Sequence, residues 1–259
     1  MLLAINANNT TTLFGLFVAD EERPLASWRV STRRERLPDE WYALLPPLFA
    51  AEGRQVDEVG AVVLGSVVPA ATSSLAAMAR HRLRVQPVVV GPDVAIGSRL
   101  LVDNPAEVGA DRLANTVAAF ARYGGPAVVV DLGTATNFDV VSAQGDFLGG
   151  AIAPGLTTGM EALTGRAARL FSIDLALPPR AIGTNTVDNM QAGGVLGHLA
   201  MVEGMLTRIR AELGRDAPAI ATGGNAAIFA GASAAITHHD PNLTLDGLRL
   251  IHRRVAGAV

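Results

Sequence analysis

The chain has 259 residues, of which 49% are hydrophobic and 17% are charged, with a formal net charge of -3. This charge excludes a generally basic surface, so we expect no nucleic-acid partner, and the absence of cysteine excludes disulfides and zinc–thiolate sites. No apolar run approaches the ~18 residues of a membrane span, and the initial MLLAI lacks a basic signal segment, so we expect a cytoplasmic protein with no membrane partner.

The chain opens with a predicted three-stranded meander. Apolar runs over residues 1–5 and 13–18 flank a polar loop, NANNTTT, and residues 25–30 predict a third strand. The loop offers hydroxyls, amides and backbone N–H groups, which suit phosphate oxygens.

Alternating helices and strands follow the meander. A helical stripe covers residues 38–52, although Pro46 and Pro47 predict that the helix kinks or splits. A strand over 59–67, a helix over 70–83 and a short strand over 87–90 predict a parallel part of the same sheet.

The segment DNPAEVGADR, residues 103–112, opens a helix that we expect to reach Arg122. Asp111 lies near the helix start, where the helix dipole favours a carboxylate that can accept a proton. Arg112 beside it can bind a substrate carboxylate with its planar fork. From this segment alone, a helix-capping acid with a surface arginine is an equal alternative.

A second meander carries the most informative loop. The apolar run 127–130 ends in Asp131, the loop 133–136 follows, and further strands are predicted over 138–141 and 147–152. This loop combines a glycine, hydroxyls and a carboxylate, a set that suits nucleotide phosphates and a cation.

The two loops appear to repeat each other. An offset of 125 residues places Asn6 on Asp131, Asn8 on Gly133 and Thr11 on Thr136. Self-similarity over half the chain predicts two related domains with a cleft between them, each contributing one hairpin loop.

The remaining chain predicts helices and one more buried strand. A helix over 156–168, an irregular segment over 171–180 and a long helix over 187–213 precede a strand over 219–221. The long helix contains glycines at 193, 194 and 197, which suit close helix packing, either across a dimer or within the chain.

Glycines also follow the strand over 219–221. Gly223 and Gly224 predict either a ligand against the backbone or a plain left-handed turn, and we expect a helix after them. His238, His239 and Asp240 predict a solvated turn rather than a metal site, and an amphipathic helix over 243–255 ends the pattern.

Several motifs in one order resemble the type III pantothenate kinases, members of the actin-like and sugar-kinase ATPase superfamily. They are GADR at 109–112, DLGTAT at 131–136, GGAIAPG at 149–155, GTNTVDNMQAG at 183–193, ATGG at 221–224 and LTLDGL at 243–248. The resemblance implies an α/β, duplicated ribonuclease-H-like (actin-like ATPase) fold, with mixed sheets flanked by helices. We assign the two domains to residues 1–114 and 115–259.

The resemblance also implies an activity. It is the ATP-dependent phosphorylation of pantothenate to 4'-phosphopantothenate, the first step of coenzyme A biosynthesis. The implied cofactors are ATP, Mg²⁺ and a monovalent cation, K⁺ or NH₄⁺. The implied assembly is a homodimer whose sites draw on both subunits.

Family roles carry over to individual positions. Asp111 is the implied general base, and Asp131 is the implied ligand of the monovalent cation. The implied pantothenate-binding residues are Gly109, Ala110, Arg112, Thr186 and Val102. The implied ATP-binding residues are Asn6, Asn8, Asn9, Thr10, Thr11, Thr12, Thr134, Gly223 and Gly224.

The first loop departs from the family pattern Asp-x-Gly-Asn-Thr. Asn6 replaces the aspartate and Asn8 replaces the glycine, a mild change if the φ angle there is positive. Asn137 stands where the family often has threonine, and Val102 where many members have tyrosine. Because Asn6 lacks the anionic charge, a catalytically impaired homologue with a regulatory or accessory role is the alternative. A sugar or acetate kinase is a weaker one.

Overall fold

The computed structural model describes residues 1–18, 21–91 and 93–257. The chain forms two compact units, the first made of Met1–Ala121 with Asn242–Val259 and the second of Arg122–Pro241. These units differ from the predicted domains 1–114 and 115–259, chiefly because the last helix belongs to the first unit. Its contacts with the central strands of that unit account for the difference.

The first unit is built on a five-stranded mixed sheet with the order β3-β2-β1-β4-β5. Its strands are β1 (Leu2–Ala7), β2 (Thr11–Phe17), β3 (Ala26–Ser31), β4 (Ala61–Ser66) and β5 (Val88–Val89). The first three strands form an antiparallel meander, and β4 and β5 continue from β1 in parallel. The predicted meander with a parallel extension is therefore confirmed.

The second unit repeats this sheet, with the order β10-β9-β6-β7-β8. Its strands are β6 (Ala127–Leu132), β7 (Ala135–Val141), β8 (Phe147–Pro154), β9 (Ala219–Thr222) and β10 (His238–His239). Again three strands form an antiparallel meander and two more run parallel to the first. The internal repeat inferred from the two loops is thus a repeat of whole sheets.

Strand register corrects one detail of that repeat. Ala7 pairs with Thr12 across the first hairpin, whereas Leu132 pairs with Thr136 across the second. The first loop is therefore one residue longer, and Thr12 rather than Thr11 is the counterpart of Thr136. The offset of 125 residues does not hold after the loop, because one extra loop residue does not change the apolar spacing of the strands on either side.

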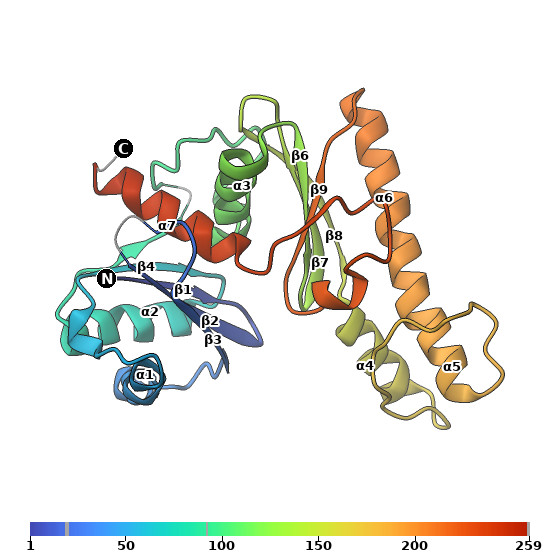
Figure 1. The fold of residues 1–259 in the computed structure, drawn as a ribbon, viewed down its shortest axis with the longest axis horizontal. Helices are drawn as coiled ribbons and strands as arrows, with labels where there is room; N and C mark the ends of the chain where they lie inside the picture. The colour runs from blue at the N-terminus through green and yellow to red at the C-terminus, as the bar shows by residue number, and fades with distance from the viewer. Residues whose placement is uncertain (19–20, 92, 258–259) are drawn as a thin grey trace. The chain divides into compact units, whose positions relative to one another are not determined.

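Helices cover both faces of the first sheet (Figure 1). One face carries α1 (Pro38–Ala51) and α2 (Pro69–Met78), which continues into a π-helical turn, η2 (Ala79–Leu83). The other face carries α7 (Leu243–Val255), which lies beside α3 (Ala110–Tyr123). Short 3-10 turns, η1 (Val56–Glu58) and η3 (Pro105–Glu107), complete the unit.

The sequence predicted that the first helix kinks or splits at its prolines; the split is wrong, because α1 runs through both Pro46 and Pro47. Trp41, Leu45 and Phe49 are fully buried on one side of this helix and join the apolar core under the sheet. Burial of that stripe offsets the backbone hydrogen bonds that the prolines remove.

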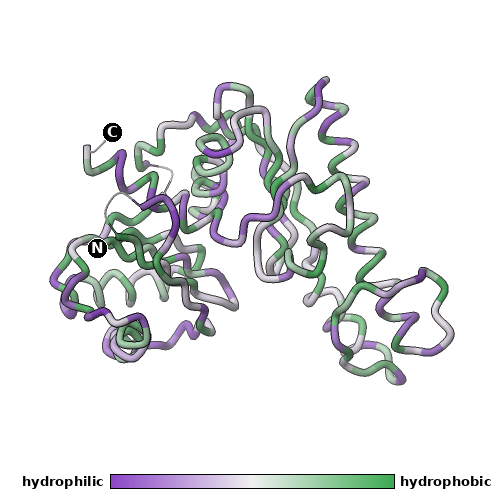
Figure 2. The backbone as a smooth tube through the Cα atoms, viewed as in Figure 1, coloured by the Kyte–Doolittle hydropathy of each residue, from purple (hydrophilic) through white to green (hydrophobic). Residues whose placement is uncertain are grey.

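The second unit has its own core and helices. These are α4 (Leu156–Arg166), α5 (Thr186–Gln191), a π-helical segment η4 (Ala192–Leu196) and α6 (Gly197–Leu213). The predicted long helix is therefore continuous in α5, η4 and α6, with a change of helical period inside it. Val128, Phe138 and Leu206 belong to the core between the sheet and these helices. Apolar segments follow the strands of both sheets in Figure 2.

Two expectations near the end of the second unit are wrong. His238 and His239 form β10, which pairs in parallel with β9, so they are not a solvated turn. Asp240 is buried and forms an ion pair with Arg122, and the Tyr123 hydroxyl donates to Asp240 at 3.1 Å. The expected helix after Gly224 is only a 3-10 turn, η5 (Ala226–Phe229).

Within the described part of the chain, no helix combines the length and apolar character needed to cross a membrane.

The close contact between α7 and α3 leaves no room for a side chain at Gly247. A Cβ atom at this position would overlap the backbone of Ala114. We expect Gly247→Ala to lower the free energy of unfolding by about 1–3 kcal/mol, the usual cost of overpacking. Chemical denaturation measures this change.

Gly204→Ala is the matched control, because Gly204 is exposed on α6 and a Cβ there would meet no other atom within 4 Å. Helix propensity predicts that this variant gains about 0.5–1 kcal/mol. Equal stability of the two variants would contradict the packing described for α7.

Candidate active site

The first polar loop leaves the sheet at the carboxyl end of β1. The Asn8 N–H donates to the Thr11 carbonyl at 3.0 Å, and Thr32 N–H holds the Thr10 carbonyl at 2.9 Å. These bonds leave the side chains of Asn9 and Thr10 exposed at the tip. Asn6 is only 3% exposed.

Two buried oxygens at this loop are available as hydrogen-bond acceptors. The side-chain oxygens of Asn6 and Asn8 are buried, and neither has a hydrogen-bond partner among the residues that the structure describes. Because an unsatisfied buried acceptor costs about 1–3 kcal/mol, such atoms usually have a bound partner. Metal-bound water or a cation would satisfy both oxygens.

Asn8 does not adopt the left-handed conformation. Arg84 is the non-glycine residue with positive φ in the described chain. We expected asparagine to be a mild replacement for glycine if the φ angle were positive, and it is not positive. The backbone at Asn8 is instead one that any residue can adopt, so the replacement causes no backbone strain.

The start of α3 lies at the same edge of the first sheet as this loop. Asn6 pairs with Gly65 across β1 and β4, and Val67 N–H donates to the Ala7 carbonyl at 3.1 Å. A Cβ on Gly109 would lie 3.2 Å from the Val67 side chain. The first unit thus brings the loop and the GADR motif together, over residues far apart in sequence.

Gly109 also makes room for the Asp111 carboxylate. A Cβ at position 109 would lie 2.6 Å from Asp111 Oδ1, and that oxygen accepts a 2.9 Å hydrogen bond from Arg112 N–H. Burial raises the pKa of Asp111, against the opposing effects of this backbone hydrogen bond and the Arg112 charge. A carboxylate with a raised pKa is a stronger proton acceptor than an exposed one.

The other residues predicted to bind substrate fall in both units. Ala110 is buried, and Val102 and Arg112 are half-buried, all in the first unit. Thr186 is exposed as the first residue of α5, in the second unit. Their part in binding stays a prediction.

The second loop has an equivalent position at the edge of the second sheet. Asp131 pairs with Thr222 across β6 and β9, and the chain then turns at Gly223, whose φ is +92°. A Cβ at Gly223 would overlap Asp131 Oδ1 and lie 2.7 Å from the Leu132 nitrogen. Glycine is therefore required here both by the backbone angle and by the carboxylate beside it.

The Asp131 carboxylate is the implied ligand of a monovalent cation. Among the described residues, no group of three or more acidic or histidine side chains gathers as a metal site. Asp131 Oδ1 instead lies beside main-chain atoms of the turn at Leu132 and Gly223, and its part as a cation ligand stays a prediction.

The tip of the second loop lies against the N-terminus of α4. Gly155 N–H and the Thr158 hydroxyl both donate to the Thr134 carbonyl, at 3.1 and 2.8 Å. Gly155 caps this helix without a side-chain hydrogen bond. The N-terminal N–H groups of α4 thus lie next to Thr134, and such groups favour phosphate. Gly133 has no positive φ, and a Cβ there would make only ordinary contacts at 3.5 and 3.7 Å, so neither the backbone nor the packing requires glycine at this position.

Sequence analysis missed His198. Its Nε2 shares a 2.9 Å hydrogen bond with the Thr136 hydroxyl, and its ring stacks on Phe229 with centroids 5.8 Å apart. Burial lowers the pKa of His198, which keeps the imidazole neutral near pH 7. No spacing rule could connect residues 62 apart, and the π-helical segment just before His198 alters which way it faces.

The first loop has a similar anchor. The hydroxyls of Thr12 and Thr32 share a hydrogen bond of 2.7 Å, and Thr12 is fully buried. Thr12 and Thr136 therefore use their hydroxyls to hold the loops. Any role of Thr12 toward ATP, which stays a prediction, would act through the position of the loop.

Two units with the same mixed sheet, each with a polar hairpin loop at the same sheet edge, define the duplicated ribonuclease-H-like fold of the actin-like and sugar-kinase ATPases. Solved structures agree with this assignment. A Campylobacter jejuni protein described as a Baf family transcriptional activator is 17% identical, with TM-score 0.62 and coverage of 98% of this chain and 99% of its own. A Sinorhizobium meliloti protein described as a 2-dehydro-3-deoxygalactonokinase is 14% identical, with TM-score 0.57 and coverage of 98% and 97%.

Similarity in sequence identifies the family within this fold class. The family model for type III pantothenate kinase matches residues 2–208. Proteins named type III pantothenate kinase from Acidobacterium capsulatum and Thermomicrobium roseum are 48% and 47% identical, over 97% and 98% of this chain and 94% and 98% of their own lengths. The chain belongs to the type III pantothenate kinase family.

The raised pKa of Asp111 predicts a stability effect. A carboxyl whose folded pKa exceeds its unfolded value contributes stability that is lost as pH rises through the folded pKa. Because asparagine cannot ionise, we expect Asp111→Asn to unfold at a higher temperature than the native chain at pH 7.5. The difference should shrink as pH is lowered toward 5.

Thermal unfolding across this pH range measures the effect, with Asp57→Asn as the control at an exposed aspartate. A lower melting temperature for Asp111→Asn at pH 7.5 would show that Asp111 stabilises the fold instead.

Proposed function

We propose that this chain is an ATP-dependent kinase that phosphorylates pantothenate to 4'-phosphopantothenate, the first step of coenzyme A biosynthesis. The observation that carries this proposal is the half-buried Asp111 carboxylate, with its raised pKa, at the same sheet edge as the first polar loop. Relatives named type III pantothenate kinase, 46–48% identical over almost the whole chain, support the choice of substrate.

Asp111 acts as the general base. Its carboxylate accepts the proton of the pantothenate primary hydroxyl while the hydroxyl oxygen bonds to the γ-phosphorus of ATP, and the bond to the bridging oxygen breaks to release ADP. The Arg112 N–H holds one oxygen of the carboxylate at 2.9 Å, which fixes its orientation. Phosphoryl transfer asks the protein mainly for such alignment and for charge stabilisation.

Pantothenate binding is assigned to the GADR motif and its neighbours. The guanidinium of Arg112 pairs with the pantothenate carboxylate, and the small residues Gly109 and Ala110 let the substrate approach the start of α3. Val102 supplies apolar contact without the hydroxyl that many family members have. Thr186, exposed on α5, adds a hydrogen bond.

ATP binding is assigned to the two polar loops. Residues 8–11 and Thr134 contact the phosphates, Thr12 holds the first loop in position, and the N-terminus of α4 adds backbone N–H donors next to Thr134. Gly223 and Gly224 lie beside the nucleoside. Mg²⁺, when bound with ATP, neutralises charge on the transferred phosphoryl group, and the buried oxygens of Asn6 and Asn8 would accept hydrogen bonds from its water ligands.

Asp131 is assigned to a monovalent cation, K⁺ or NH₄⁺. The support is its single carboxylate in a tight turn that only glycine at 223 permits. We also propose a homodimer. Large apolar side chains are exposed on the second unit, among them Ile182 at 82%, Ile152 at 67% and Phe171 at 53%, and such exposure is typical of an interface.

No comparison favours the alternative of a catalytically impaired accessory protein. The structural neighbour described as a transcriptional activator is 17% identical, and a likeness at that level shows the fold alone.

A coupled ADP-release assay with pantothenate, Mg²⁺ and K⁺ tests the kinase proposal. We expect turnover by the native chain and a loss of at least about 100-fold in kcat for Asp111→Asn, because the general base is removed. The acid limb of kcat/KM should lie above the usual aspartate pKa of about 3.9. Turnover that survives Asp111→Asn unchanged would exclude Asp111 as the base.

Asn6 offers a second test. Restoring the family's charge with Asn6→Asp should raise kcat, by up to about 100-fold to 1,000-fold if one preorganised charge is missing. The charge is buried, so Asn6→Asp should also lower the melting temperature, and Mg²⁺ with ATP should restore it.

Asn6→Ala is the matched control, because it removes the amide without adding charge. If Asn6→Asp and Asn6→Ala change kcat alike, position 6 does not act through charge on the nucleotide.

A further inference from the structure

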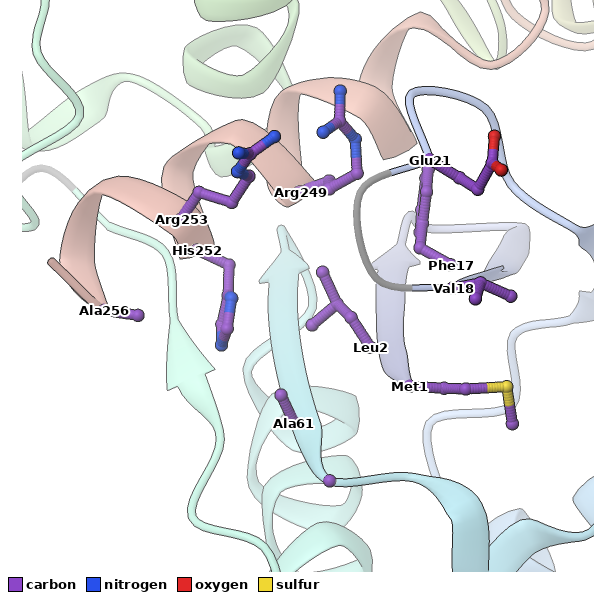
Figure 3. Close-up of a pocket in the computed structure, with 11 residues that line it drawn as sticks. Met1, Leu2, Phe17, Val18, Glu21, Ala61, Arg249, His252, Arg253 and Ala256 are labelled. Carbon is purple, nitrogen blue, oxygen red and sulfur yellow. The ribbon is translucent and has the colours of Figure 1, made fainter. Parts of the chain in front are cut away.

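The first unit contains a pocket that the kinase assignment does not use. It has a volume of about 440 Å³ and lies where β1 and β4 begin and β2 ends (Figure 3). Because the first loop and the GADR motif lie where β1 and β4 end, the pocket is at the opposite edge of the same sheet. Its volume falls in the range of about 300–1,000 Å³ that is usual for small-molecule sites.

Apolar side chains form one side of the pocket. Leu2 of β1, Phe17 of β2 and Ala61 of β4 line it at the sheet edge. Figure 3 shows Leu2 and Ala61 facing the space beneath α7. These side chains offer a surface that would bind the apolar part of a ligand by excluding water.

The other side of the pocket is a basic stripe of α7. Arg249, His252, Arg253 and Ala256 line it, and their spacing of three and four residues places them on one helical face. In Figure 3, His252 points down toward the strands, whereas the guanidinium groups of Arg249 and Arg253 lie higher, at the level of α7. Leu245 and Leu248 lie one turn before Arg249 and His252 on the same face of α7, and they are buried against the sheet.

The two arginines differ in how they are engaged. Arg249 is 6% exposed, its guanidinium lies 3.9 Å from the Asp246 carboxylate, and it lies 5.7 Å from the Phe17 ring centre. Arg253 is half-buried and forms no ion pair within the part of the chain that the structure describes. Burial lowers the pKa of His252, so this side chain contributes hydrogen bonding rather than charge near pH 7.

We propose that this pocket binds a small carboxylate with a short apolar body, at a second site separate from the active site. The carboxylate pairs with the fork of Arg253, and the apolar body packs on Leu2, Phe17 and Ala61. Glu21 is exposed at the rim and adds negative charge, which disfavours polyanions such as nucleotides. A single carboxylate is therefore the head group that the charges fit.

Hexanoate is a suitable probe, with acetate and hexan-1-ol as its charged-only and apolar-only counterparts. Titration calorimetry and NMR on the full chain should show one hexanoate site with a Kd on the order of 1 mM. Acetate and hexan-1-ol should bind at least about 10-fold more weakly, because each keeps only half of the interaction.

Variants place the probe in this pocket. Arg253→Gln should weaken hexanoate binding about 10-fold, and Ala256→Phe, which adds bulk at the exposed end of α7, should do so by blocking the mouth. Arg208→Gln, at an exposed arginine of α6, is the matched control and should bind hexanoate normally. The two pocket variants should keep the melting temperature and kinase activity of the native chain.

Competition separates this site from the pantothenate site. Saturating pantothenate and the Arg112→Gln variant should both leave hexanoate binding unchanged. The proposal is overturned if hexanoate does not bind, if pantothenate displaces it, or if neither pocket variant weakens it. These readouts are direct binding, so they stand whether or not the chain proves to be a pantothenate kinase.

Discussion

Parallel pairing of one buried central strand with its neighbour places the polar loops of both units of this protein. In the first unit β1 pairs with β4, and in the second β6 pairs with β9, with both central strands almost wholly apolar and buried. Strands that run in parallel end at one sheet edge, so polar residues that follow them gather there. Asn6 thereby comes beside Gly65, and Asp131 beside Thr222.

Glycine gives the two key carboxylates their positions. Asp111 Oδ1 occupies space that a side chain at 109 would fill, and Asp131 Oδ1 does the same at 223. In each unit a carboxylate is thus held against backbone by the absence of a Cβ, in surroundings that exclude much of the water. Burial raises the pKa of Asp111, so the feature that suits it to the proposed role of base also works against stability, a conflict common at catalytic groups.

The elements predicted from the sequence agree best with the structure where the periodic spacing of apolar residues determines the element. The strands of both meanders and the amphipathic helix α7 follow from apolar spacing, since burial of those stripes is what forms them. Errors arose where local chemistry and long-range packing compete. Pro46 and Pro47 remain inside α1 because the helix buries Trp41, Leu45 and Phe49, and His238 with His239 pairs with β9 although nothing local marks a strand.

By itself, the sequence determined the duplicated fold and the family and proposed the site residues, because strand periodicity and short motifs are local properties of the chain. Only the tertiary structure decided that Thr12 occupies the position in the first sheet that Thr136 occupies in the second. It also decided that His198 holds the second loop and that α7 belongs to the first unit. Each of these depends on register or on contacts between distant residues. Such contacts exist only after the buried strands have aligned.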